Sequence, residues 1–174
     1  MKSNNIIKFQ IFSTIFEILM GALLHFTFEW SNKNPIIGIF SSVNESTWEH
    51  LKLAFIPMAL TSLIGFFLFN KNKAFLCSKV IGIIFTLSFI TIFFYSYTGI
   101  LGRNIAILDI LTFIIAIIIG EYVSYKKIIS NYNCNTTIAF IILFFLFLCF
   151  ILFTFNPPKI ALFQDPITGM YGIF

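Results

Sequence analysis

The chain has 174 residues, of which 59% are hydrophobic, 10% are charged and 25 are phenylalanine. Roughly a quarter of the residues of a soluble domain are charged, so this composition excludes a soluble globular protein and indicates an integral membrane protein. The formal net charge is +4, but the basic residues are scattered among short loops, which argues against a nucleic-acid partner and leaves the lipid bilayer as the expected surroundings.

Five hydrophobic segments are long enough to cross a bilayer, because each membrane helix uses roughly 20 residues. They cover residues 6–30, 51–70, 76–101, 105–125 and 136–155. The length leaves no room for a second domain. The sequence therefore predicts an all-α fold, a polytopic transmembrane helical bundle with about five spanning helices and a short outer segment, in a single domain over residues 1–174.

The charges of the loops predict the orientation, because cytoplasmic loops of membrane proteins are enriched in lysine and arginine. With the N-terminus inside, seven basic residues fall on the inner side and four on the outer side. We therefore expect a multi-pass protein of the cell membrane with a cytoplasmic N-terminus and an extracytoplasmic C-terminus. The inner residues are Lys2, Lys8, Lys71, Lys73, Lys79, Lys126 and Lys127, and the outer ones are Lys33, Lys52, Arg103 and Lys159.

The three cysteines, Cys77, Cys134 and Cys149, form no CxxC pair and are odd in number. This pattern indicates neither a disulfide framework nor a thiolate metal site. We expect them to be packing or loop residues.

Five of the seven carboxylates and both histidines gather on the outer side of this map. The inner loops contain lysines as their only charged residues, so loop solubility does not require carboxylates and histidines to gather on the outer side. We expect a polar pocket in the extracytoplasmic half that suits a small-molecule or lipid ligand. Its candidate residues are His25, Glu29, Asn44, Glu45, Glu49, His50, Lys52, Arg103, Asp109 and Asp165.

Four residues of the first segment, Glu17, Gly21, His25 and Glu29, recur at every fourth position. Residues at this spacing form one stripe along a helix, which we expect to face the interior of the bundle. A carboxylate near the middle of a membrane costs at least about 2.5 kcal/mol unless it is protonated, paired or hydrated, so Glu17 needs a partner or a water-filled cavity. An interhelical hydrogen bond would give Glu17 a purely structural role.

The stretch SSVNESTWEH at residues 41–50 combines a helix start with ionisable groups. Residues 42–45 and 46–49 both fit the capping box S/T-x-x-E, and one of them is predicted to begin the second span. A helix start accounts for one glutamate, because the helix dipole favours a carboxylate there, and leaves the other unexplained.

Residues 156–174 follow the last span. Pro157 and Pro158 stop the helix, and Asp165 with Pro166 and Gly169 indicates a turn. The apolar residues of this tail favour docking over an unstructured end. We expect the tail to fold back over the outer mouth of the bundle.

The stretches HFTFEW at 25–30, NESTWEHLKL at 44–53 and FNPPKIALFQDPITGMYGIF at 155–174 resemble a family of bacterial multi-pass membrane proteins of unknown function. The likeness covers nearly the whole chain and implies that the three stretches belong together, but it brings no substrate. A weaker likeness, confined to NESTWEH, is to membrane hydrolases of the alkaline ceramidase and progestin-receptor-like superfamily, which use a glutamate and several histidines around zinc. This chain lacks their C-terminal HxxxH.

Three function classes fit these residues. The first is a membrane-embedded enzyme whose divalent metal ion activates water against a lipid or peptide. Its hypothetical ligands are His25, Glu29, Glu49 and His50. The second is a small-solute or proton/cation transporter, in which Glu17 joins His25 and Glu29, and the third is a non-catalytic structural membrane protein with ion pairs between helices. The spacing matches no established zinc signature, so the sequence leaves the molecular function, the cofactor and the oligomeric state open, with a slight preference for a binding or catalytic pocket.

Overall fold

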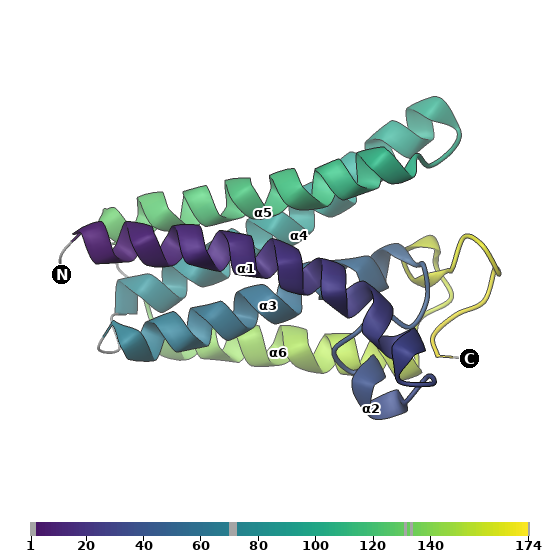
Figure 1. Cartoon of the computed structure of the whole chain (residues 1–174), viewed down its shortest axis with the longest axis horizontal. Helices are drawn as coiled ribbons and strands as arrows, with labels where there is room; N and C mark the ends of the chain where they lie inside the picture. Colours follow the sequence, from purple (N-terminus) through teal and green to yellow (C-terminus); the bar gives the residue numbers. More distant parts are fainter. Residues whose placement is uncertain (1–2, 70–72, 131, 133, 174) are drawn as a thin grey trace.

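Five long helices lie side by side in the computed structural model (Figure 1). The structure describes residues 3–69, 73–130, 132 and 134–173. All five long helices have the length and apolar composition of membrane spans, which confirms the predicted all-α fold and number of spans. They are α1 (Ser3–Trp30), α3 (Thr47–Leu68), α4 (Lys73–Leu101), α5 (Ala106–Ile129) and α6 (Thr136–Phe155), with the short helix α2 (Pro35–Gly38) and the 3-10 helix η1 (Ala161–Phe163).

The helix bounds follow the predicted segments closely, and the largest differences have local causes. Helix α3 begins at Thr47, before the predicted residue 51, because the side chain of Ser46 accepts a hydrogen bond from the backbone N–H of Glu49 and caps the helix. Helix α5 continues to Ile129, past the predicted residue 125, with Lys126 and Lys127 in its last turn. Basic side chains are favourable at that end of a helix dipole. The predicted last residue of the second span, residue 70, lies outside the described residues.

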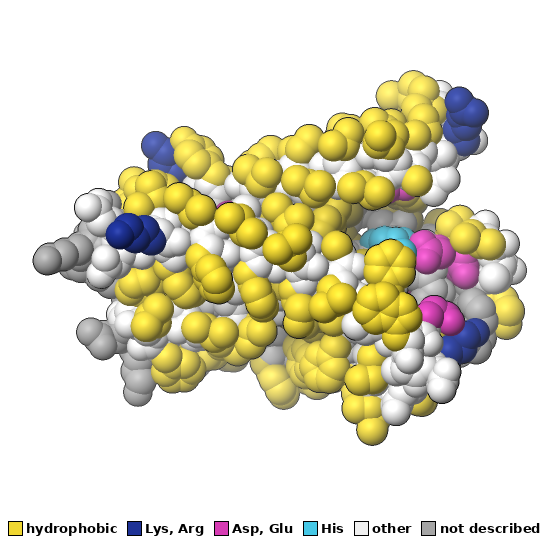
Figure 2. All heavy atoms as spheres, viewed as in Figure 1, with side chains coloured by type: hydrophobic (Ala, Val, Ile, Leu, Met, Phe, Trp, Pro, Cys, Tyr) yellow, Lys and Arg dark blue, Asp and Glu magenta, His cyan; other side chains and the backbone are white. Residues whose placement is uncertain are grey.

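Helices α3 and α4 form the centre of the bundle. Helix α3 packs against α1 and α4, α5 packs on α4 and α1, and α6 covers α3 and α4. The start of α1 and the tail after α6 lie at opposite ends of the bundle, and the turn between α4 and α5 projects away from the other helices (Figure 1). Hydrophobic side chains cover most of the side in view, and charged groups gather at the two ends (Figure 2). This distribution is compatible with a multi-pass membrane protein.

Gly21 lets α1 approach α3 closely between Glu17 and His25. A Cβ atom placed at Gly21 would lie 2.7 Å from the backbone oxygen of Leu53 and 2.5 Å from Cζ of Phe113. The carbonyl of Leu53 lies one turn before Pro57, whose missing N–H leaves that carbonyl without its helical donor. The small residue therefore sets the spacing between the helix that carries His25 and the helix that carries His50.

The C-terminal tail docks on the bundle, as predicted. Asn44 donates its side-chain N–H to the backbone oxygen of Gly172 at 2.9 Å. The backbone N–H of Ile173 donates to the backbone oxygen of Thr154 at 3.1 Å. The ring centroids of Trp48 and Phe163 lie 4.9 Å apart. The tail thus packs beside the start of α3 and the end of α6.

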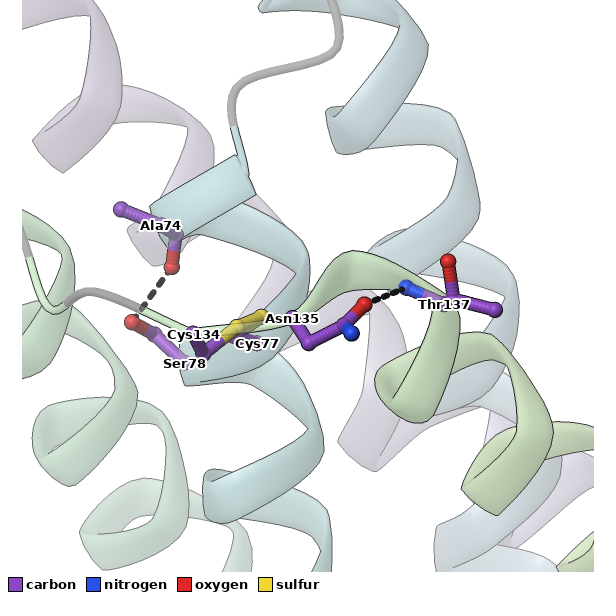
Figure 3. Close-up of a disulfide and its surroundings, with 6 residues drawn as sticks. All are labelled: Ala74, Cys77, Ser78, Cys134, Asn135 and Thr137. Carbon is purple, nitrogen blue, oxygen red and sulfur yellow. Dashed lines mark hydrogen bonds between the residues drawn. A yellow bond between two sulfur atoms is a disulfide. The ribbon is translucent and has the colours of Figure 1, made fainter.

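A disulfide joins Cys77 to Cys134 and corrects the expectation that the cysteines are only packing or loop residues (Figure 3). Cys77 lies in the first turns of α4, and Cys134 directly precedes Asn135, whose side chain caps α6 at Thr137. The bond ties α4 to the start of α6 across a sequence separation of 57 residues. Two cysteines this far apart form no sequence motif, so the spacing gave no signal of the pairing. Cys149 is free, as expected.

Two of the lysines assigned to loops lie inside the protein. Lys52 and Lys79 both have 0% of their surface exposed, so neither can count as a loop charge. Without Lys79 the count of inner basic residues falls from seven to six, and without Lys52 the count of outer basic residues falls from four to three. The charge bias therefore keeps its direction.

Candidate functional site

Three ligand-type side chains converge where α1 ends and α3 begins. Nε2 of His25 lies 3.7 Å from Oε1 of Glu45, and Nε2 of His50 lies 3.5 Å from Oε2 of the same carboxylate. The imidazole rings are 5.3 Å apart, and one ligand atom from each of the three residues lies within 4.8 Å of the others. We call His25, Glu45 and His50 the histidine site.

The other nitrogen of each imidazole has an oxygen partner. Nδ1 of His50 lies 3.0 Å from the backbone oxygen of Ser46, which only accepts, so Nδ1 carries the hydrogen. Nδ1 of His25 lies 3.3 Å from the hydroxyl oxygen of Ser42, and that hydroxyl donates to the backbone oxygen of His25 at 3.4 Å. Each imidazole is thereby held with Nδ1 beside an oxygen and Nε2 directed to Glu45, the orientation that metal-binding histidines adopt.

The loop between α2 and α3 is fixed by a buried serine. Ser41 accepts a hydrogen bond from the backbone N–H of Phe28 at 3.0 Å and donates to the backbone oxygen of Leu24. The side chain of Asn44 accepts from the N–H of Ser46 at 2.9 Å. These bonds hold residues 41–46 against the last turns of α1, which brings Glu45 to the histidines.

Glu49 and Lys52 form a closed network instead of joining the histidine site. Nζ of Lys52 lies 2.6 Å from Oε2 of Glu49 and donates to the backbone oxygen of Gly38 at 2.7 Å and to the hydroxyl of Thr154 at 2.9 Å. The Thr154 hydroxyl donates to Oε1 of Glu49 at 2.8 Å, and Val43 N–H donates to Oε2 at 3.1 Å. All hydrogens of the ammonium thus have acceptors, and the network joins α2, α3 and α6.

The remaining predicted residues lie apart from the histidine site or face other partners. Glu29 is exposed at the end of α1, and Arg103 is exposed beyond α4. Asp109 accepts a hydrogen bond from the hydroxyl of Tyr97, within the pair α4 and α5. Asp165 is buried but accepts from Ile167 N–H and Thr168 hydroxyl of its own turn. Asn44 orders the loop and the tail through the bonds given above.

A second polar cluster lies deeper, around Lys79. Its Nζ is 2.5 Å from Oε1 of Glu121 and 3.3 Å from Oε1 of Glu17, and the Thr61 hydroxyl also donates to Glu17. The expected partner of Glu17 is therefore present. The count of basic residues assigns Lys79 to the inner side, because it lies near the beginning of the predicted span. The start of α4 at Lys73 instead places Lys79 almost two turns inside the helix.

The family model "Family of unknown function (DUF6512)" matches residues 1–173. The chain belongs to this family. The membership confirms the expectation of a family of unknown function, and the DUF6512 match extends over α1 to α6 and the docked tail. Comparisons with curated proteins and with solved structures give no match. The histidine site of this DUF6512 protein must therefore be interpreted from its own chemistry.

Proposed function

We propose that the protein binds a divalent metal ion at His25, Glu45 and His50, and that the ion serves hydrolysis at the membrane surface. One observation carries the proposal: both Nε2 atoms face one carboxylate while both Nδ1 atoms are held by oxygen partners. An ion pair between a protonated histidine and Glu45 would need only one imidazole. Two imidazoles oriented in the same way favour a metal.

The separations fit a metal of ordinary size. Ligand bonds of about 2.1 Å in a tetrahedral site place neighbouring ligand atoms about 3.4 Å apart. The two nitrogen-to-oxygen separations, 3.7 Å and 3.5 Å, are close to this value but end on different oxygens of Glu45, and one ligand atom from each of the three residues lies within 4.8 Å of the others. Small side-chain movements would complete the geometry.

The ligand set favours zinc or a related transition metal with an open position. Imidazole nitrogen suits zinc and other transition metals, whereas magnesium and calcium prefer oxygen ligands. Structural zinc sites use four protein ligands, while catalytic sites use three and leave a position at which the ion activates water. The side chains of His25, Glu45 and His50 are 29%, 42% and 38% exposed. Water and a substrate can therefore reach the site.

The surroundings favour a lipid ester or amide as substrate. The histidine site lies near the end of α1 and the start of α3, two helices that are long and apolar enough to span a membrane, and the ends of such helices reach the headgroup region. The ring of Phe26 lies 5.0 Å from that of His25, the ring of Trp30 stacks on Phe26 at 5.8 Å, and both Phe26 and Trp30 are exposed. Figure 2 shows histidine next to hydrophobic side chains at this end of the protein. These rings offer a surface to an acyl chain while the scissile bond lies at the polar site. The charge bias supports an extracytoplasmic position for this end.

Metal content and hydrolysis test the proposal together. The detergent-purified wild type, loaded with zinc and desalted, should retain about one ion per chain and hydrolyse a fluorogenic lipid ester or amide. Glu45→Gln should lose the ion and the hydrolysis, and Glu29→Gln, which changes an exposed carboxylate on α1, should keep both. Equal metal content in Glu45→Gln and wild type would refute the metal site. Retained zinc without hydrolysis would refute the catalytic part alone.

A further inference from the structure

The cluster around Lys79 is separate from the histidine site. Its charged members are Glu17 on α1, Lys79 on α4 and Glu121 on α5, and we call them the buried charge cluster. Glu17 lies eight residues before His25 on α1, or about 12 Å along the helix. The exposed fractions are 0% for Glu17, 0% for Lys79 and 3% for Glu121. The cluster therefore has little access to bulk water.

The charges of this cluster do not balance when all three groups are ionised. A single ammonium faces two carboxylates, at 2.5 Å and 3.3 Å, which leaves one negative charge inside the bundle. Helix α3 contributes the hydroxyl of Thr61, which is neutral and brings no compensating charge. An uncompensated charge in a membrane interior is costly, so a further positive charge is required.

The cluster also holds buried oxygen atoms that lack hydrogen-bond partners among the described residues. They include Oε2 of Glu17 and Oε2 of Glu121, the carboxylate oxygens that do not contact Lys79. Three further buried oxygens also lack a hydrogen-bond partner: the hydroxyls of Ser13 and Ser124 and the side-chain oxygen of Gln10. Ser13 lies four residues before Glu17, and Ser124 lies three after Glu121, so each shares a helix face with a carboxylate.

Gln10 connects the two helices that carry the carboxylates. Its side-chain N–H donates to the backbone oxygen of Glu121 at 3.2 Å. A Cβ atom at Gly82, one turn after Lys79, would lie 3.0 Å from Cβ of Ser124. The polar faces of α1, α4 and α5 therefore pack against one another around Lys79.

We propose that the buried charge cluster is a proton-binding site, in which one proton resides on the carboxyl group of either Glu17 or Glu121, the two partners of Lys79. The proton binds an Oε2 atom, converts that carboxylate to a neutral carboxyl group and balances the charge of the cluster. It also turns that unpartnered acceptor oxygen into a hydroxyl group that can donate a hydrogen bond. An alkali cation would bring the same charge, but Lys79 already lies between the two carboxylates and repels a second cation.

Infrared spectroscopy tests the proposal directly, because the carbonyl stretch of a protonated carboxyl group is separate from the bands of an ionised carboxylate. The wild type at neutral pH should show the protonated band. Glu17→Gln and Glu121→Gln should each abolish it, because either variant leaves one carboxylate paired with Lys79. Lys79→Met should increase the band about twofold, since both carboxyl groups then need protons. Glu29→Gln, at an exposed carboxylate, should leave the band unchanged.

Several results would overturn the proposal. The first is the absence of the protonated band from wild type at neutral pH. The second is survival of that band in both glutamine variants. The third is a thermal stability that depends on sodium in wild type but not in Glu17→Gln. The last result would identify an alkali cation as the balancing charge. If the variants do not fold, a pH titration of the wild type decides: the band should persist at neutral pH and disappear only at alkaline pH, and its disappearance below neutral pH contradicts a buried proton.

Discussion

His50 donates its Nδ1 hydrogen to the backbone oxygen of Ser46, 3.0 Å away and one helical turn earlier. Ser46 also caps α3 through its hydroxyl, which accepts from the backbone N–H of Glu49. The residue that starts the helix therefore also orients the imidazole. This relationship links the capping motif, which is visible in the sequence, to the direction of Nε2 toward Glu45.

Ser42 should contribute to metal affinity without touching the metal. Ser42→Ala removes the oxygen that faces Nδ1 of His25, and loss of such a partner costs about 10–100-fold in affinity. Competition with a chromophoric zinc chelator measures the change. Ser31→Ala is the matched control, because its hydroxyl donates to Phe28 on the same helix, away from the imidazoles. Equal affinity in Ser42→Ala and wild type would contradict the role given to Ser42.

Lys52 should stabilise the fold by compensating Glu49. Lys52→Met leaves a buried carboxylate with no cation, which costs about 3–5 kcal/mol of unfolding free energy. The double variant Lys52→Met with Glu49→Gln removes both charges and should recover more than half of that loss. Denaturant titration in detergent micelles measures these values. Lys159→Met, at an exposed lysine, should stay within about 0.5 kcal/mol of wild type. A double variant no more stable than Lys52→Met would contradict the pairing.

Gly21 should be intolerant of even one added methyl group. Gly21→Ala places Cβ against the backbone of Leu53 and the ring of Phe113 and should cost about 1–3 kcal/mol. Gly99→Ala is the control, because no neighbouring atom lies within 4 Å of the place that its added methyl group would occupy, and it should be neutral or stabilising by up to about 1 kcal/mol. The same titration compares them. Equal stability of the two variants would show that the helices are not held at this spacing.

The orientation of the protein in the membrane predicts the redox state of Cys77 and Cys134 in cells. The cysteines lie at the end of the bundle that the charge bias assigns to the cytoplasm, where thiols are kept reduced. Cys77 and Cys134 should therefore be thiols in intact cells quenched with acid before alkylation, and should pair during purification in air. A cysteine at position 159, in a background without the native cysteines, should react with an impermeant reagent from outside. A Cys77–Cys134 disulfide present in quenched cells, with position 159 protected, would invert the orientation.

Much of the fold could be predicted because hydrophobic length alone defines a membrane span, and the bounds of α6 agree with the sequence to the residue. The site could be predicted only in part. His25 and His50 were expected together, since one ends a span and the other begins the next. The choice of Glu45 over Glu29 or Glu49 depends on the path of the loop after α2, which Ser41 fixes through contacts between distant residues. Periodicity contains no information about such contacts, and for the same reason it does not reveal the burial of Lys79.

The central claim is that His25, Glu45 and His50 hold a metal ion, and anomalous X-ray scattering at the zinc absorption edge tests it most directly. Crystals of the zinc-loaded protein should show one strong peak at about 2.0–2.2 Å from Nε2 of His25, Nε2 of His50 and a carboxylate oxygen of Glu45. The peak should be absent from crystals of Glu45→Gln. A zinc peak elsewhere on the chain, with these three side chains joined only to one another, would contradict the account.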